Sequence, residues 1–261
     1  MVNFITFGTD NCEELLSYFY DNLLKFCPED FTLHYYSINY KSSLVGEYFI
    51  NHVFETNKNF ERGFDYKPYI ILKSMIDIPN ENLVYLDLDI MLTKNFSSKK
   101  LFDSIKLSKT PLAPNHYWEH PFNIIKGEKL EDGERLSKHL GITLTQKYLQ
   151  ACMIVYNKNH FEFLCDWISL TDNPEIFELT INDEEILNIL LHKYNQPNSL
   201  GYICISRSTV IIEDKDDMES IKLLHSLYQE DKFDKLYFIK QNNFYKNLDV
   251  SNIMVFHGIK N

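Results

Sequence analysis

The chain has 261 residues, of which 44% are hydrophobic and 24% charged, and a formal net charge of −11. This composition is that of a globular protein that buries a sizeable core, and the acidic balance without a basic block argues against nucleic-acid binding and electrostatic membrane anchoring. No apolar run is long enough for a transmembrane helix, and five cysteines without a Cys-x-x-Cys pair predict reduced thiols in a cytoplasmic protein.

The first elements predict an α/β layout. Residues 2–7 are predicted as a strand that ends in the turn Phe7-Gly8-Thr9. The next helix is expected to begin with a capping box of Asp10 and Glu13, and a second strand covers residues 31–37. This opening is typical of nucleotide-binding sheets, in which the first turn lies at the carboxyl edge. A turn glycine without a ligand explains Gly8 equally well.

Two helices are predicted next. Residues 43–54 form the first, and the second opens at Tyr66-Lys67-Pro68, where the proline occupies a tolerated first-turn position. Lys67, at the start of that helix, is either a solvated surface lysine or a cation that faces a phosphate.

The stretch from Leu83 to Leu86 predicts a short strand buried on both faces, and Asp87 and Asp89 follow it directly. Unpaired carboxylates are too costly inside a buried strand, so we expect the pair where the strand emerges. Residues i and i+2 of an extended chain point the same way, which gives two oxygen ligands for Mg²⁺ or Mn²⁺. The alternative is that both are solvated loop acids.

The second half continues the alternation of helices and strands. We expect a helix ending near Leu107, a short strand at 111–114, an aromatic and histidine-rich loop at 115–121, and a surface excursion or mobile lid at 126–141. Further elements are strands at 150–156, 202–205, 209–212 and 252–256, and helices at 161–170, from Asn182-Asp183-Glu184 onward, and after residue 217.

The last predicted strand leads into His257-Gly258-Ile259-Lys260. A chain end is normally frayed, but this one is tied to the core as far as His257. An imidazole is a common ligand of transition metals, so His257 would complete the shell begun by Asp87 and Asp89, and Lys260 would meet a phosphate.

These motifs, together with Gln150-Ala151-Cys152-Met153, occur in the order seen in GT-A-fold glycosyltransferases, and the chain most resembles the glycogenin-like and bacterial galactosyltransferase-like group, family eight. The resemblance implies an α/β fold: a single GT-A (Rossmann-like) domain over residues 1–261 with a mostly parallel central sheet flanked by helices. Residues 1–115 would bind the nucleotide, and residues 116–261 the sugar and the acceptor.

The resemblance also implies roles for individual residues. Asp87 would contact the ribose and the metal, Asp89 and His257 would complete the metal site, and Lys67 and Lys260 would approach the diphosphate. By the same resemblance, Phe7, Gly8 and Thr9 would form part of the base and ribose pocket. Gln150 and Asp183 would lie near the transferred sugar or the acceptor.

The expected reaction is therefore metal-dependent transfer of a sugar from a nucleoside diphosphate sugar, a UDP-sugar, to a hydroxyl of a glycan or other acceptor. Retention of configuration is expected, whereas inversion would require a base, for which Asp183 or Glu184 is the candidate. Two alternatives stay open. One is a non-catalytic nucleotide-sugar-binding protein. The other is a haloacid-dehalogenase-type phosphatase, whose motif has Thr or Val at the position of Met91.

Overall fold

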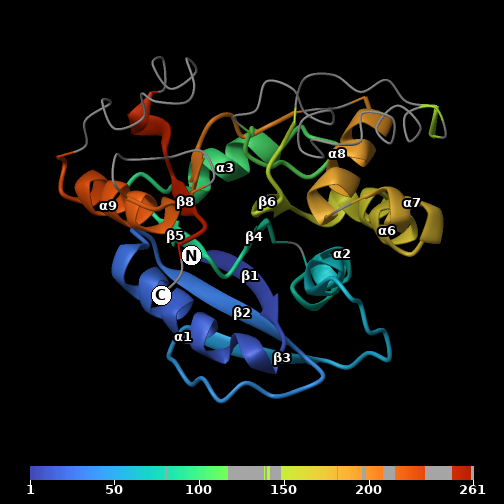
Figure 1. Cartoon of the computed structure of the whole chain (residues 1–261), viewed down its shortest axis with the longest axis horizontal. Coiled ribbons are helices and arrows are strands. Elements are labelled where there is room, and N and C mark those ends of the chain that lie inside the picture. Colours follow the sequence, from blue (N-terminus) through green and yellow to red (C-terminus); the bar gives the residue numbers. More distant parts are fainter. Residues whose placement is uncertain are drawn as a thin grey trace.

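The structure of the protein is a computed structural model. It describes residues 1–79, 81–116, 138, 140–141, 148–180, 182–195, 198–207, 215–232 and 249–259. A five-stranded sheet in the order β3-β2-β1-β4-β6 lies at its centre, beside a three-stranded sheet in the order β5-β8-β7 (Figure 1). No helix in these ranges is both long and apolar enough to cross a membrane.

The central sheet is mostly parallel, as predicted. Its strands are β1 (Val2–Gly8), β2 (Phe31–Ile38), β3 (Phe49–Phe54), β4 (Leu83–Leu86) and β6 (Met153–Tyr156). β1 pairs in parallel with β2 and β4, and β2 pairs in parallel with β3. β6 runs antiparallel to β4. The carboxyl ends of β1 and β4 therefore meet at one edge.

The smaller sheet contains β5 (Ile90–Leu92), β7 (Cys204–Ser206) and β8 (Val255–His257). β8 pairs antiparallel with β5 and parallel with β7. Only three residues separate the end of β4 from the start of β5, so one tight turn links the two sheets. The last described strand of the chain is thereby brought beside the Asp87–Asp89 turn.

Helices cover both faces of the central sheet. Seven α-helices are described: α1 (Glu13–Phe26), α2 (Lys67–Asp77), α3 (Ser98–Ile105), α6 (Phe161–Thr171), α7 (Pro174–Leu179), α8 (Asp183–Lys193) and α9 (Asp217–Gln229). Short 3-10 turns lie at Asp10–Cys12, Gly63–Tyr66, Lys158–His160 and Val250–Asn252. Apolar residues of α2, α6 and α8 pack in one core cluster, and those of α1 and α3 pack in another.

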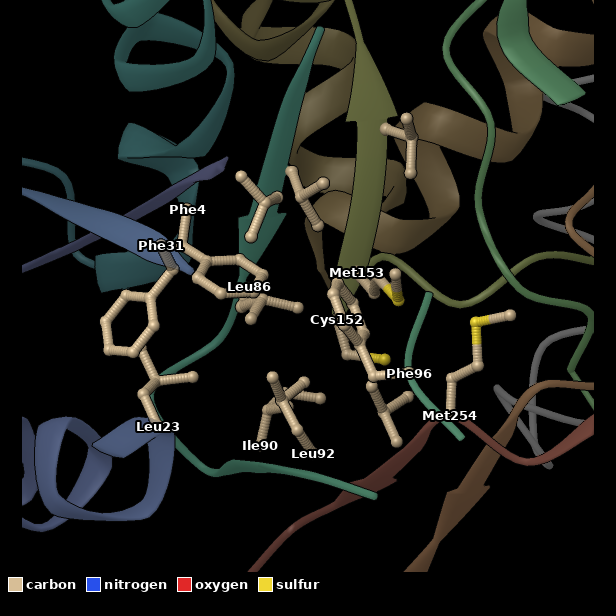
Figure 2. Packing of buried hydrophobic residues seen from close by; sticks show 14 of the residues in the cluster. Phe4, Leu23, Phe31, Leu86, Ile90, Leu92, Phe96, Cys152, Met153 and Met254 are labelled. Atoms are coloured by element: carbon tan, nitrogen blue, oxygen red, sulfur yellow. The ribbon is translucent and has the colours of Figure 1, made fainter. Parts of the chain in front are cut away.

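The second cluster anchors the turn between β4 and β5. Leu86, directly before the turn, and Ile90 and Leu92, directly after it, are all buried in this cluster. Figure 2 shows them among Phe4, Phe31, Phe96, Met153 and Met254. The apolar residues on both sides fix the turn at the sheet edge, and the two polar carboxylates are left at its surface.

Two predictions at the level of elements are wrong. Residues 43–54 are not a helix, because Phe49–Phe54 forms β3 and pairs along its length with β2. Phe49–Phe54 is rich in residues that favour strands, and its pairing with β2 decides its conformation. The predicted capping box is also absent, since α1 begins at Glu13 after a 3-10 turn and the Asp10 carboxylate accepts from Asn11 N–H.

Other boundaries differ or cannot be compared. The strand expected at 111–114 is a single bridge between Leu112 and Val155, and the strand expected from residue 150 begins at Met153. Most of the predicted loop at 115–121, most of the excursion at 126–141 and the strand at 209–212 lie outside the described residues.

Two buried histidines, His160 and His225, are expected to make the fold less stable in acid. Nε2–H of His160 donates to Ser108 O, and Nδ1 accepts from Asn157 N–H, so a second ring proton has no place. Nε2 of His225 lies 3.2 Å from Leu92 O. Burial lowers the pKa of each to about 4. The unfolded chain binds these protons near pH 6.5 and the folded chain only near pH 4, so stability is lost as the pH falls through this window.

We expect the free energy of unfolding, measured with urea, to be lower at pH 5 than at pH 7 by roughly 2 kcal/mol for each of these histidines. His225→Gln keeps an N–H donor for Leu92 O and removes one titrating group, so its pH-dependent loss should be smaller by about that amount. An unchanged pH dependence in this variant would contradict the assignment.

Candidate active site

The two predicted metal ligands Asp87 and Asp89 lie on the turn between the sheets. Asp87 N–H donates to Cys152 O at 2.9 Å, which ties the start of the turn to the residue before β6. Ile90 N–H donates to Asp87 O at 3.3 Å and closes the turn. Both side chains are partly exposed, as expected for carboxylates placed where a buried strand emerges.

His257, the last residue of β8, reaches the same turn. It pairs with Ile90, the first residue of β5. Its Nε2 lies 3.3 Å from Asp89 Oδ1 and 3.9 Å from Asp87 Oδ2. The three residues predicted from far-separated parts of the sequence are thus brought together, and one ligand atom of each lies within 4.8 Å of the others.

The chain after His257 folds back onto the turn. Gly258 has φ +89, a left-handed conformation that favours glycine, and a Cβ there would meet the Arg207 side chain at 2.7 Å. The N–H groups of Gly258 and Ile259 both donate to Asp89 O, at 2.9 and 3.0 Å. The segment is therefore anchored as far as Ile259, and Lys260 lies outside the described residues.

The three side chains fit a divalent cation. Two carboxylates and one imidazole suit Mn²⁺ well and Mg²⁺ less well, because Mg²⁺ prefers oxygen ligands. Neighbouring ligands of an octahedral ion with bonds near 2.1 Å are roughly 3 Å apart. The separations of 3.3 and 3.9 Å at His257 Nε2 are close to that value.

A cavity of about 320 Å³ opens beside the turn and contains several of the predicted nucleotide-binding residues. Its lining comes from the carboxyl end of β1, the start of α1, the segment before α2, the Asp87–Asp89 turn and the start of α8. The lining residues are Phe7, Gly8, Thr9, Cys12, Leu15, Gly63, Phe64, Lys67, Tyr85, Asp87, Leu88, Asp89 and Asp183.

Gly8 is required at its position for a steric reason. A Cβ there would lie 2.6 Å from the Tyr35 hydroxyl and 2.8 Å from Cys12 Cβ. The backbone of β1 therefore passes close to the 3-10 turn Asp10–Cys12 and to β2 at the wall of the cavity, and no larger residue fits without displacing them. The glycine has a packing role whether or not it also borders a ligand.

Lys67 connects three elements beneath the cavity. Its Nζ lies 2.6 Å from Asp183 Oδ2 in α8 and 3.1 Å from Asp87 Oδ1, and it donates to Ala151 O at 3.0 Å. The Lys67 side chain is only 3% exposed. Of the two alternatives for this lysine, a solvated surface residue is therefore wrong.

The charged groups at the site shift one another's pKa values. Burial lowers the pKa of Lys67, but Asp183 and Asp87 outweigh burial and raise it, so the ammonium form is favoured. Burial raises the pKa of Asp183, while Lys67 opposes that rise. Burial lowers the pKa of His257, but its interactions with Cys152, Asp89 and Asp87 outweigh burial and raise it to about 10.

Glu184, the second residue of α8, is a further titratable group near the turn. Its Oε2 accepts from Ala151 N–H at 2.9 Å, so both polar backbone groups of Ala151 are bound, one by Glu184 and the other by Lys67. Burial raises the pKa of Glu184 to about 7 against the effect of this hydrogen bond.

Gln150 is placed differently from the other predicted site residues. Its side chain is buried, its Nε2 donates to Asn115 O at 3.1 Å, and its Oε1 lies 3.4 Å from Cys204 Sγ and 3.7 Å from Cys152 Sγ. Gln150 does not line the cavity described above. A contact between Gln150 and a sugar stays a prediction.

The sequence interpretation missed the polar role of Tyr85 and most of the apolar cavity wall. The sequence predicts Tyr85 only as part of a buried strand, yet its hydroxyl donates to Asp87 Oδ1 at 2.6 Å. Its position two residues before Asp87 on one strand was the available signal, because alternate side chains share a face. No motif pointed to Cys12, Leu15, Gly63 or Phe64 as cavity residues.

No family model and no curated protein sequence matches this chain. Solved structures do match it. Galactosyltransferase LgtC, in complex with donor and acceptor sugar analogues, is 13% identical with a TM-score of 0.56, and the match covers 98% of this chain and 86% of LgtC. An active-site mutant of LgtC is 12% identical with a TM-score of 0.54 and the same coverage.

The apo structure of the bifunctional glycosyltransferase WbbM is 12% identical with a TM-score of 0.59, and the match covers 98% of this chain and 45% of WbbM. At this level of identity the similarity establishes the fold. The chain has the GT-A fold found in these glycosyltransferases, as its motifs predicted. Its assignment to the family-eight group stays a prediction.

Proposed function

We propose that this chain is a metal-dependent glycosyltransferase that moves a sugar from a nucleoside diphosphate sugar, a UDP-sugar, to a hydroxyl of a glycan or other acceptor. The observation that supports this most is the convergence of Asp87, Asp89 and His257 beside a cavity at the carboxyl edge of a GT-A sheet. In open α/β sheets this edge is where ligands bind.

The cavity suits the nucleotide part of such a donor. Phe7, Gly8 and Thr9 at the end of β1 would border the base and ribose, and Asp87 and Asp89 line the same cavity. We assign residues 1–115 to nucleotide binding and residues 116–261 to sugar and acceptor binding, within one domain. A contact of Lys260 with the diphosphate and the cytoplasmic location stay predictions.

The barrier to transfer is the departure of the diphosphate from an anomeric carbon that gains positive charge. Asp87, Asp89 and His257 would hold Mn²⁺ or Mg²⁺, which supplies charge stabilisation at the leaving oxygens when bound. We propose retention of configuration. Asp183 is paired with Lys67, so among the two candidate bases for inversion Glu184 has the less compensated carboxylate.

The two alternatives are less well supported. A haloacid-dehalogenase-type phosphatase uses its two aspartates as nucleophile and acid, and it has no need for a histidine such as His257 beside them. A non-catalytic binding protein would keep the cavity but not require the three ligand atoms of Asp87, Asp89 and His257 to converge. Hydrolysis of the nucleotide sugar, measured with and without acceptor, separates a binding protein from an enzyme.

Thermal melting with a panel of nucleoside diphosphates and their sugars, with Mn²⁺ or with EDTA, tests the proposal. A ligand at 100 times its Kd stabilises the native state by about 2.7 kcal/mol. We expect the melting temperature to rise by several degrees with a uridine nucleotide and Mn²⁺, and this rise to be lost with EDTA. If no nucleotide changes the melting temperature, the proposal fails.

A further inference from the structure

The two carboxylate oxygens of Asp87 have different surroundings. Oδ1 accepts from the Tyr85 hydroxyl at 2.6 Å and lies 3.1 Å from Lys67 Nζ. Oδ2 faces His257, whose Nε2 is 3.9 Å away. One oxygen is thus held from below by two donors, and the other is directed toward the group of proposed metal ligands.

Oxygen atoms of the protein already surround the Lys67 ammonium. An ammonium has three N–H donors, and three oxygens surround this one: Asp183 Oδ2, Asp87 Oδ1 and Ala151 O. The side chain is 3% exposed, so a phosphate in the cavity would have to displace one of these partners. The arrangement fits a lysine that holds Asp87 better than one that binds the diphosphate.

Tyr85 holds Asp87 from the same strand face. Its ring is buried, lies 5.1 Å from Lys67 Nζ and packs against Phe7 with the ring centres 6.0 Å apart. A buried tyrosine hydroxyl needs a hydrogen-bond partner, and here that partner is a proposed metal ligand. A phenylalanine would fill the same space without fixing the carboxylate.

We propose that Tyr85 and Lys67 are positioning residues that hold Oδ1 of Asp87 and so direct Oδ2 toward the bound cation. This inference rests on the metal site of the proposed function and adds to it two residues that do not touch the ion. Groups that hydrogen-bond to a ligating carboxylate fix its orientation, and their loss typically costs 10–100-fold in metal affinity or activity.

Tyr85→Phe tests the inference because it removes one hydroxyl without changing charge or shape. The readout is the affinity of the purified protein for Mn²⁺ alone, measured by electron paramagnetic resonance of the free ion, so that neither donor nor acceptor needs to be known. We expect Mn²⁺ to bind at least about tenfold more weakly than to the wild-type protein.

Tyr36→Phe is the matched control. Tyr36 is also a buried strand tyrosine whose hydroxyl donates to a carboxylate, Asp77 Oδ2 at 3.0 Å, but it does not line the cavity. The two variants should melt at similar temperatures, and Tyr36→Phe should bind Mn²⁺ as the wild type does.

The two possible failures are distinct. Wild-type protein that binds no Mn²⁺ would remove the proposed metal site itself. Wild-type protein that binds Mn²⁺, together with Tyr85→Phe that binds it equally well, would overturn only the positioning role. An equal loss of affinity in Tyr36→Phe would also overturn it, because the effect would then be a general one of losing a buried hydroxyl.

Discussion

Asp89→Asn is expected to reduce kcat/KM for sugar transfer by about 1,000-fold or more. Asp89 Oδ1 lies 3.3 Å from His257 Nε2, and its carboxylate is one of three proposed ligands. A neutral amide is a poorer ligand for a hard cation, and loss of about 4 kcal/mol of charge stabilisation in the transition state corresponds to a thousandfold in rate. The assay uses the nucleotide sugar that stabilises the wild-type protein in the melting panel.

The fold should survive this change. The backbone oxygen of Asp89, not its side chain, accepts the N–H groups of Gly258 and Ile259. We therefore expect the variant to melt within a few degrees of the wild type. Asp103→Asn is the matched control, because Asp103 is exposed in α3 and pairs only with its neighbour Lys106 among the ion pairs of the described residues. Full activity in Asp89→Asn would contradict the metal-dependent mechanism.

The parts of the site that sequence predicts are those encoded by local pattern. An apolar run followed by Asp87 and Asp89 places carboxylates at a strand end, because burial of the run and exclusion of charge act on adjacent residues. The same reasoning places His257 after a terminal apolar strand. That these strand ends meet depends on the antiparallel pairing of β5 and β8 in the structure. The resemblance implied only that His257 would join the two aspartates at the metal.

The parts that sequence does not predict depend on partners distant in the chain. The sequence predicted a helix at residues 43–54 and gave no sign that Phe49–Phe54 would pair with β2. The Gln150 side chain turns toward Cys152 and Cys204 because β7 lies beside it in space. Lys67 at a helix start has the pattern of a surface residue, and only the fold shows that Asp183 meets it in the interior.

Lys67→Met is expected to lower the free energy of unfolding by roughly 3–5 kcal/mol, the usual cost of removing one partner of a buried ion pair. The side chains of Lys67 and Asp183 are 3% and 9% exposed, so water does not replace the lost ammonium. Asp183 would be left as an uncompensated buried carboxylate, and Asp87 would lose one of the two donors at Oδ1. Urea unfolding at pH 7 measures the change.

A double variant distinguishes the loss of the whole Lys67–Asp183 ion pair from the loss of one partner. In Lys67→Met/Asp183→Leu no buried charge is left without a partner, and replacement of a whole buried pair by apolar residues is often close to neutral. We expect most of the stability lost in Lys67→Met to return. Lys73→Met, in the same helix α2 and paired with Asp77 at the surface, should change stability by less than about 1 kcal/mol.

The double variant also distinguishes the two roles considered for Lys67. It is expected to fold without the ammonium, so its affinity for the nucleotide reports directly on a contact with the diphosphate. If Lys67 only holds Asp87, nucleotide affinity at saturating Mn²⁺ should stay within a few-fold of the wild type while the affinity for Mn²⁺ alone changes. A large loss of nucleotide affinity at saturating Mn²⁺ would instead mean that the ammonium leaves one of its three oxygens to meet the phosphate.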